Sequence, residues 1–154
     1  MSISIRQATL RDLDEIYRIE LECFAHDAFS RRLLEYFLRS SDFITLIAFL
    51  DERPAGFIAA SFDYHQSKPA AHIYTIDVKQ DCRRIGVGSS LLIFLEGIMM
   101  EKNIKACYLE VRVDNVAARN LYFKHGYKPL ETLKDYYGFG VDGIRFRKEL
   151  KTGK

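Results

Sequence analysis

Arg83-Arg84-Ile85-Gly86-Val87-Gly88-Ser89 (residues 83–89) is the stretch that decides the fold, because it follows an apolar, strand-like run and leads directly into a long apolar helix. Gly86 and Gly88 have no side chain to keep a ligand away from the backbone. The first turn of a helix leaves backbone N–H groups without intrahelical partners and carries partial positive charge, so it attracts anions. The segment therefore predicts a loop that binds a phosphate group.

Two common nucleotide-binding motifs do not fit this segment. The dinucleotide motif G-x-G-x-x-G has a third glycine where this chain has Leu91, and the P-loop needs Gly-Lys followed by Ser or Thr, which occurs nowhere in the chain. The pattern R-x-x-G-x-G does fit, from Arg83 to Gly88. On this motif alone, a tight strand-to-helix turn without a ligand is the alternative.

Length and composition indicate one globular unit. The chain has 154 residues, of which 48% are apolar and 29% are charged, without a low-complexity run or an obvious repeat. A chain of this length has room for one well-buried core. We expect one domain over residues 1–150 and a short disordered tail over residues 151–154.

Charge and hydropathy exclude several classes of partner. The formal net charge is +2 and the Lys and Arg residues are scattered, so no nucleic-acid partner is predicted. Residues 1–6 lack the layout of a secretory signal, and no apolar run reaches the roughly 20 residues that span a bilayer. The prediction is a cytoplasmic protein without a membrane partner.

The three cysteines, Cys23, Cys82 and Cys107, have spacings that match neither a disulfide framework nor a zinc motif. We therefore expect reduced thiols and no metal site. Cys107 lies in a strand-like run and is predicted to be part of the core.

Hydrophobic periodicity predicts an α/β protein with a mixed sheet. Thr9 is placed to cap the first helix, with Asp12 three residues later, and Gly126 is placed to end the last helix. The expected strands are 3–8, 43–50, 55–63, 71–78, 105–113, 127–137 and 143–150, and the expected helices are 10–24, 30–40, 91–99 and 115–125. In the first helix, the residues predicted to face mostly the core are Leu13, Ile16, Tyr17, Glu20 and Leu21.

Taken together, several patterns in one order resemble the GNAT superfamily of N-acetyltransferases, in particular its protein N-terminal acetyltransferase type (RimI-like and NatA-catalytic-subunit-like enzymes). The resemblance covers nearly the whole chain, and it implies the order β-α-α-β-β-β-α-β-α-β-β in a mostly antiparallel sheet with splayed parallel central strands. The segments that carry it are 72–78, 83–88, 109–112, Asn115 with 117–118, 121–122 with 126–127, and 136–137 with Asp142.

The resemblance implies acetyl-CoA as co-substrate. It implies that the backbone of Ile76 and Val78 contacts the pantetheine arm, and that Asn115 both caps a helix and contacts the CoA. A solvated loop pair is the alternative for the two arginines. The residues that would hold the pyrophosphate are Arg83, Arg84, Gly86, Gly88 and Ser89.

Acetyl transfer to an amine requires a base, and Glu110 is the first candidate. Strand alternation places Tyr108, Glu110 and Arg112 on the less apolar face of the strand 105–113. An α-amino group has a pKa of roughly 7.7–8, so a carboxylate acting directly or through water suffices as base. His72, at a position where related enzymes place a base or a substrate contact, is the second candidate. The alternatives are a surface glutamate paired with a cation and a structural histidine.

The other candidates concern the leaving group and the substrate. Helical spacing turns Tyr122 toward the protein body, where it is the candidate acid for the departing thiolate; a core tyrosine is the alternative. The resemblance implies that Asp27 contacts the substrate, although a helix-capping aspartate is the alternative. It also implies that Tyr136 and Tyr137 grip the first substrate residues, against the alternative of a cross-strand aromatic pair.

These observations favour an Nα-acetyltransferase that acts on protein or peptide N-termini, with ribosomal proteins among the candidate targets and a ribosome or an auxiliary subunit as candidate partners. Two other hypotheses remain at this level. One is an acetyltransferase for small amines, and the other is a non-catalytic acyl-CoA-binding accessory subunit.

Overall fold

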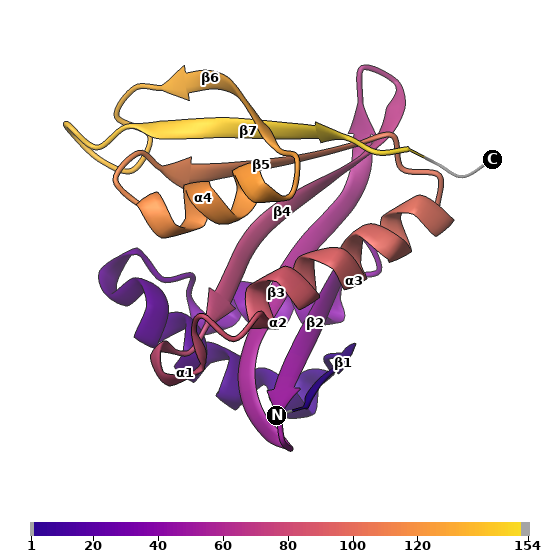
Figure 1. The fold of residues 1–154 in the computed structure, drawn as a ribbon, viewed down its shortest axis with the longest axis vertical. Coiled ribbons are helices and arrows are strands. Elements are labelled where there is room, and N and C mark those ends of the chain that lie inside the picture. The colour runs from indigo at the N-terminus through magenta and orange to yellow at the C-terminus, as the bar shows by residue number, and fades with distance from the viewer. Residues whose placement is uncertain (1, 152–154) are drawn as a thin grey trace.

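The computed structural model describes residues 2–151, and its elements follow the predicted order (Figure 1). The strands are β1 (Ile3–Gln7), β2 (Phe43–Leu50), β3 (Arg53–His65), β4 (Lys68–Val78), β5 (Ala106–Arg112), β6 (Lys128–Leu133) and β7 (Gly143–Glu149). The helices are α1 (Leu13–Phe24), α2 (Arg31–Arg39), α3 (Val87–Glu101) and α4 (Val116–Lys124), and short 3-10 turns lie at η1 (Leu10–Asp12), η2 (Ala25–Asp27) and η3 (Gln80–Cys82).

The seven strands form one mixed sheet that is split in its middle. The strand order is β1-β2-β3-β4-β5-β7-β6, and β4 and β5 are parallel neighbours while the other pairs are antiparallel. The β4–β5 register runs from Ala70↔Ala106 to Ile73↔Leu109, although β4 continues to Val78. The two strands therefore diverge toward their carboxyl ends, as Figure 1 shows, and the predicted splayed arrangement is confirmed.

Helices cover both faces of the sheet. On one face α1 and α2 pack on Ile47, Phe57 and Ala59; on the other, α3 and Tyr122 of α4 pack on residues such as Ile58. Because side chains alternate along a strand, the consecutive residues Phe57 and Ile58 belong to different cores. The gap between β4 and β5 thus lies between two hydrophobic cores, one on each face of the sheet.

Local signals explain where the first helices begin. The Thr9 side chain accepts a hydrogen bond from the backbone, and the Asp12 carboxylate accepts one from the Thr9 N–H, so the predicted capping box is confirmed. The predicted helix 10–24 is a 3-10 turn followed by α1. The core prediction was wrong for Leu21, which is 42% exposed, whereas Ile19 is buried. One position along an α-helix is a rotation of about 100°. Leu21, directly after the buried Glu20, therefore points away from the core.

The predicted strand 127–137 was too long, because β6 ends at Leu133. Asp135 has a positive φ of 55°, its N–H donates to Asp142 and its carboxylate accepts from the Gly140 N–H. These bonds build a turn at 134–137 in place of a strand. The last helix ends as predicted, since Gly126 follows it with a φ of 89°.

The part of the chain that the structure describes holds no helix with the length and apolar character needed to cross a membrane. The expected tail lies largely beyond that part, because residues 152–154 are outside the described residues.

Candidate active site

A cavity of about 660 Å³ lies at the divergence of β4 and β5. Its walls come from α1, the segment between α1 and α2, both diverging strands, the start of α4 and the turn after β6. The three predicted catalytic residues, His72, Glu110 and Tyr122, all line it. Other predicted residues on its walls are Ile76, Asn115, Asp27, Tyr136 and Tyr137.

The glycine loop forms the start of α3, beside the carboxyl end of β4. Gly86 caps the helix with a φ of 103°, and the intrahelical ladder starts with the bond from the Ser90 N–H to the Gly86 carbonyl. Gly88 lies close to α4, since a Cβ added there would be 3.3 Å from Leu121 Cδ2. The N–H groups of the first turn therefore precede the ladder, in the geometry that binds anions.

The two loop arginines have different roles in the structure. Arg83 donates from Nε to the Val78 carbonyl at 3.0 Å and so ties the loop to the end of β4. That carbonyl also accepts from Cys23 Sγ at 3.4 Å. Arg84 is exposed, with a positive φ of 64°. Both arginines are exposed, as the alternative of a solvated pair expected, but Arg83 is also held by its bond to Val78.

His72 and Glu110 form a direct pair across the point where the strands separate. His72 Nε2 lies 2.6 Å from Glu110 Oε1, and Arg145 Nε of β7 donates to Glu110 Oε2 at 2.9 Å. Arg145 also contacts Glu131 of β6 at 2.8 Å. The Glu110 side chain is only 9% exposed, and that of His72 is 31% exposed. The alternative interpretation, a surface glutamate paired with a cation, is thus wrong about the surface, because the Glu110 side chain is largely buried. It is right about the pair, because Glu110 contacts Arg145.

The charge state of Glu110 follows from these contacts. Burial acts to raise the pKa of Glu110, but the hydrogen bonds and charges of His72 and Arg145 together outweigh it, so the pKa lies below its ordinary value. An ionised Glu110 can only accept a hydrogen bond, so the proton between the two groups is carried by Nε2 of His72. A neutral His72 with its proton on Nε2 has its free lone pair on Nδ1. Each Glu110 oxygen already accepts one hydrogen bond, from His72 or from Arg145.

Tyr122 is buried at the back of the cavity. Its ring packs against Tyr127 and Phe146, with centroid distances of 6.0 and 6.2 Å. Burial raises the pKa of the Tyr122 phenol, and the nearby Asp77 acts in the same direction. The phenol therefore holds its proton in the free protein, as an acid that acts late in a reaction requires.

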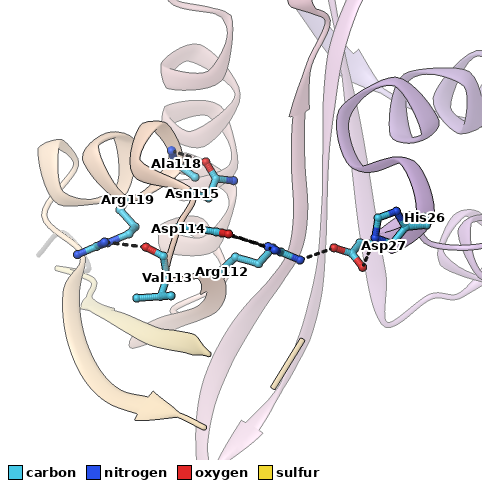
Figure 2. Close-up of polar contacts among 8 residues, drawn as sticks. All are labelled: His26, Asp27, Arg112, Val113, Asp114, Asn115, Ala118 and Arg119. Atoms are coloured by element: carbon cyan, nitrogen blue, oxygen red, sulfur yellow. Dashed lines mark hydrogen bonds and ion pairs between the residues drawn. The ribbon is translucent and has the colours of Figure 1, made fainter. Parts of the chain in front are cut away.

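Arg112 joins the α1–α2 segment to the end of β5, as Figure 2 shows. Its Nη1 donates to Asp27 Oδ2 at 2.7 Å, while Nε and Nη2 each donate to Asp114 at 3.1 Å. Asp27 Oδ1 lies 3.9 Å from His26 Nε2, beyond hydrogen-bond distance. Asp27 thus lines the cavity as one end of an ion pair, and the capping interpretation is not needed to explain it.

Asn115 and the two consecutive tyrosines occupy the positions that the sequence predicted. The Asn115 side chain accepts from the Ala118 N–H at 3.1 Å and caps α4 (Figure 2). Tyr136 and Tyr137 lie in the turn after β6 with their rings edge to face at 4.9 Å. They are neighbours in one turn, so the cross-strand interpretation is wrong. Burial raises the pKa of both phenols.

Glu20 and Thr75, which line the cavity, form a hydrogen-bonded chain with the buried Asp77. Thr75 Oγ1 is 2.5 Å from Asp77 Oδ1 and 3.2 Å from Glu20 Oε1, and Glu20 Oε2 accepts from the Phe29 N–H at 3.0 Å. A threonine hydroxyl has one proton, so the two contacts are both hydrogen bonds only if one acid is protonated. Burial, followed by the charge of Glu20, raises the pKa of Asp77 well above its ordinary value. Asp77 is the acid that holds the proton.

Sequence reasoning missed Arg145 and the acid pair. Arg145 lies opposite Glu110 in the β5–β7 register, which the sequence does not specify. The signal for Asp77 was present, since an aspartate between Ile76 and Val78 in an apolar strand needs a partner. Arg112 was predicted to share the face of Glu110, but its bond to Asp27 was not.

The split sheet, the glycine-containing helix start and the polar cavity beside it define an α/β enzyme of the N-acetyltransferase class. The sequence profile described as the acetyltransferase (GNAT) family matches residues 10–127, and the chain belongs to this family.

Relatives that align with nearly the whole chain support the same family. The chain is 35% identical over 153 residues to an uncharacterized N-acetyltransferase of Methanocaldococcus jannaschii, covering 97% of this chain and 94% of that protein. It is 34% identical over 155 residues to an N-alpha-acetyltransferase of Sulfolobus acidocaldarius, covering 92% and 89%. A crystal structure of the NatC complex bound to Gag peptide and CoA contains a chain of the same fold, with a TM-score of 0.87, 22% identity and coverage of 98% and 100%.

Proposed function

We propose that this chain transfers the acetyl group of acetyl-CoA directly to the α-amino group of protein N-termini. The observation that carries the proposal is the meeting, in one cavity, of the His72–Glu110 pair, the buried Tyr122 phenol and the Asp27 carboxylate. The relative named N-alpha-acetyltransferase supports the substrate class. The fold shared with a chain of a complex that is bound to a peptide and CoA supports the two ligands.

The residues beside the cavity fit acetyl-CoA, which supplies an activated acetyl group when it is bound. The Lys79 N–H donates to Ala55 of β3, so alternation along the strand turns the backbone groups of Val78 and Ile76 toward the gap. The Val78 carbonyl already accepts from Arg83 and Cys23, so an amide-bearing arm would pair with the Val78 N–H and the backbone of Ile76. The diphosphate would meet Arg84 and the first turn of α3 at Gly86, Gly88 and Ser89, with Arg83 fixing the loop and Asn115 near the arm.

In the proposed mechanism His72 is the base and Glu110 its orienting partner. With Nε2–H donated to Glu110, Nδ1 accepts the proton that leaves the substrate amine, and the Glu110 carboxylate stabilises the imidazolium that forms. The amine reacts in its neutral form, after its ammonium proton has passed to solvent. Its nitrogen forms the bond to the acetyl carbon as the carbon–sulfur bond breaks, and the proton that Nδ1 accepts is the one that this newly bonded nitrogen gives up. The Tyr122 phenol gives its proton to the sulfur. His72 and Tyr122 regain their starting states by exchange with solvent, and no covalent enzyme intermediate is needed.

Asp27 is expected to attract the positively charged N-terminus of the substrate. Asp27→Asn should raise the KM for a peptide about 10-fold, or ~1.4 kcal/mol, because the charge is lost and the bond to Arg112 weakens. The KM for acetyl-CoA should change little. Initial rates with each substrate varied in turn measure both values.

The matched control for this prediction is Asp114→Asn. Asp114 also bonds Arg112, but its side chain is 62% exposed, compared with 31% for Asp27. It should change the peptide KM by less than about twofold, since exposed pairs contribute little. Equal effects of the two substitutions would contradict a substrate role for Asp27.

The proposed function is tested with short peptides that differ in their first two residues. Each is compared with an Nα-blocked version that contains lysine, and acetyl-CoA consumption is measured. We expect turnover of the free N-termini only, because Tyr136 and Tyr137, which line the cavity, would hold the first substrate residues, and because an α-amine needs less help from a base than a lysine. Activity confined to blocked lysine peptides would reject the proposal.

The same panel separates the other hypotheses. Turnover of polyamines or free amino acids without peptide turnover would indicate a small-amine acetyltransferase. Binding of acetyl-CoA without any turnover would indicate an accessory subunit. Peptides that begin like ribosomal proteins test that target class, and adding ribosomes tests whether a docking partner is needed.

A further inference from the structure

His125 is a titratable side chain that the proposed mechanism does not use, and it touches the phosphate loop. It follows α4 directly, and its Nε2 lies 2.9 Å from Ser89 Oγ in the first turn of α3. The two helices already approach each other at Gly88 and Leu121. The contact therefore connects a histidine to the loop expected to hold the diphosphate.

The chemistry of this hydrogen bond depends on the ligand. A serine hydroxyl donates one hydrogen and accepts through its lone pairs. If Ser89 donates to His125, its hydrogen is not available to a ligand. If His125 donates from Nε2, the Ser89 hydrogen is free to bond an anion. A bound diphosphate selects the second arrangement because its oxygens only accept.

Charged groups around His125 set its state in the free protein. Lys124 lies at the end of α4, and Lys148 of β7 forms an ion pair at 2.9 Å with Glu96 of α3. Burial is the largest effect on the pKa of His125 and lowers it; the two lysines lower it as well, and Glu96 opposes them. A diphosphate beside Ser89 would add negative charge, which favours the protonated imidazole.

We propose that His125 positions the Ser89 hydroxyl toward the diphosphate of the acyl carrier and takes up a proton when that diphosphate binds. This rests on the proposed function, since it assumes that the loop binds CoA. His125 is then a positioning residue that makes cofactor affinity increase as the pH falls. It acts on the ligand through Ser89.

Binding calorimetry with 3′-dephospho-CoA tests the proposal. This ligand keeps the diphosphate but lacks the phosphate monoester, whose own pKa of about 6 would obscure the result. For the unaltered protein we expect proton uptake, measured in two buffers of different ionisation enthalpy, and a Kd that falls about threefold to tenfold from pH 8 to pH 6. Pantetheine, which has no phosphate, should bind without this dependence.

His125→Asn keeps a donor for Ser89 but cannot titrate, so it should remove the proton uptake and flatten the dependence of Kd on pH. His65→Asn is the matched control, because His65 is exposed in the β3–β4 hairpin region and should leave both quantities unchanged. Urea unfolding of each variant checks that it is folded.

The outcomes separate the two proposals. If the unaltered protein binds neither acetyl-CoA nor dephospho-CoA, the proposed function fails. If it binds dephospho-CoA and the His125→Asn protein shows the same proton uptake and pH dependence, the function stands and the role of His125 is wrong. If the unaltered protein and the His65→Asn protein take up a proton on binding and the His125→Asn protein does not, the role of His125 is supported.

Discussion

His72→Gln is expected to lower kcat for peptide acetylation by about 10²–10⁴-fold, the range that one positioned acid–base group contributes. The reason is geometric: Glu110 is bonded to His72 at 2.6 Å and to Arg145 at 2.9 Å and its side chain is only 9% exposed, whereas that of His72 is 31% exposed, so the imidazole is the more accessible group for the amine proton. The Kd for acetyl-CoA should stay within about twofold. Single-turnover rates and equilibrium binding measure the two quantities.

Glu110→Gln is the matched comparison, because it keeps the shape of the side chain and an oxygen that accepts from His72. It removes the charge that stabilises the imidazolium and replaces the oxygen that accepts from Arg145 Nε with an amide group that cannot accept, but it leaves the imidazole in place. We therefore expect a smaller loss in kcat, about 10–10²-fold. The loss should shrink as the pH rises, because more of the amine is then already neutral.

The order of the two effects decides between the candidate bases. A Glu110→Gln enzyme that loses more activity than His72→Gln would make Glu110 the base and His72 a structural neighbour. Tyr122→Phe tests the acid independently, since it removes only a buried hydroxyl; a variant with unchanged kcat would place the proton donor elsewhere.

Features set by a few consecutive residues could be predicted from the sequence. Gly86 and Gly88 mark the loop because backbone conformation is a local property, and α3 begins directly after Gly86. Alternation in residues 105–113 placed Glu110 and Arg112 on one face for the same reason. The splayed β4–β5 pair was expected from the resemblance alone, since no local pattern encodes where two strands separate.

Contacts between distant segments could not be predicted in this way. Arg145 follows Glu110 by 35 positions and meets it only because of the register between β5 and β7. Thr75 follows Glu20 by 55 positions, and their contact depends on how α1 crosses β4. The end of β6 at Leu133 also escaped prediction, because it depends on hydrogen bonds of the Asp135 and Asp142 side chains that the local pattern does not reveal.

Asp77→Asn is expected to stabilise the protein at pH 8 by about 1–3 kcal/mol, because at this pH the unfolded chain has released the proton that the folded protein holds on Asp77, and each pKa unit between the two states costs ~1.36 kcal/mol. Asp77 is 1% exposed, and its Oδ2 has no hydrogen-bond partner among the described residues. The asparagine amide can donate to Thr75 as the protonated acid does, without an ionisable proton. The bond from Thr75 to Glu20, and with it the anchor at the Phe29 N–H, should therefore remain.

The dependence of this effect on pH follows from the raised pKa of Asp77. Between the ordinary value of about 3.9 and the raised value, the folded state holds a proton that the unfolded chain has released, so stability falls as the pH rises through this window. Asparagine removes this fall, so the difference between the two proteins should grow from about pH 4 to the raised pKa of Asp77 and stay constant above it. Urea unfolding at several pH values measures it, with the exposed Asp63→Asn as a control expected to stay within about 0.5 kcal/mol at every pH. An Asp77→Asn protein that is less stable by the same amount at every pH would mean that Asp77 is an ionised partner of the chain, and the proton would then have to lie on Glu20.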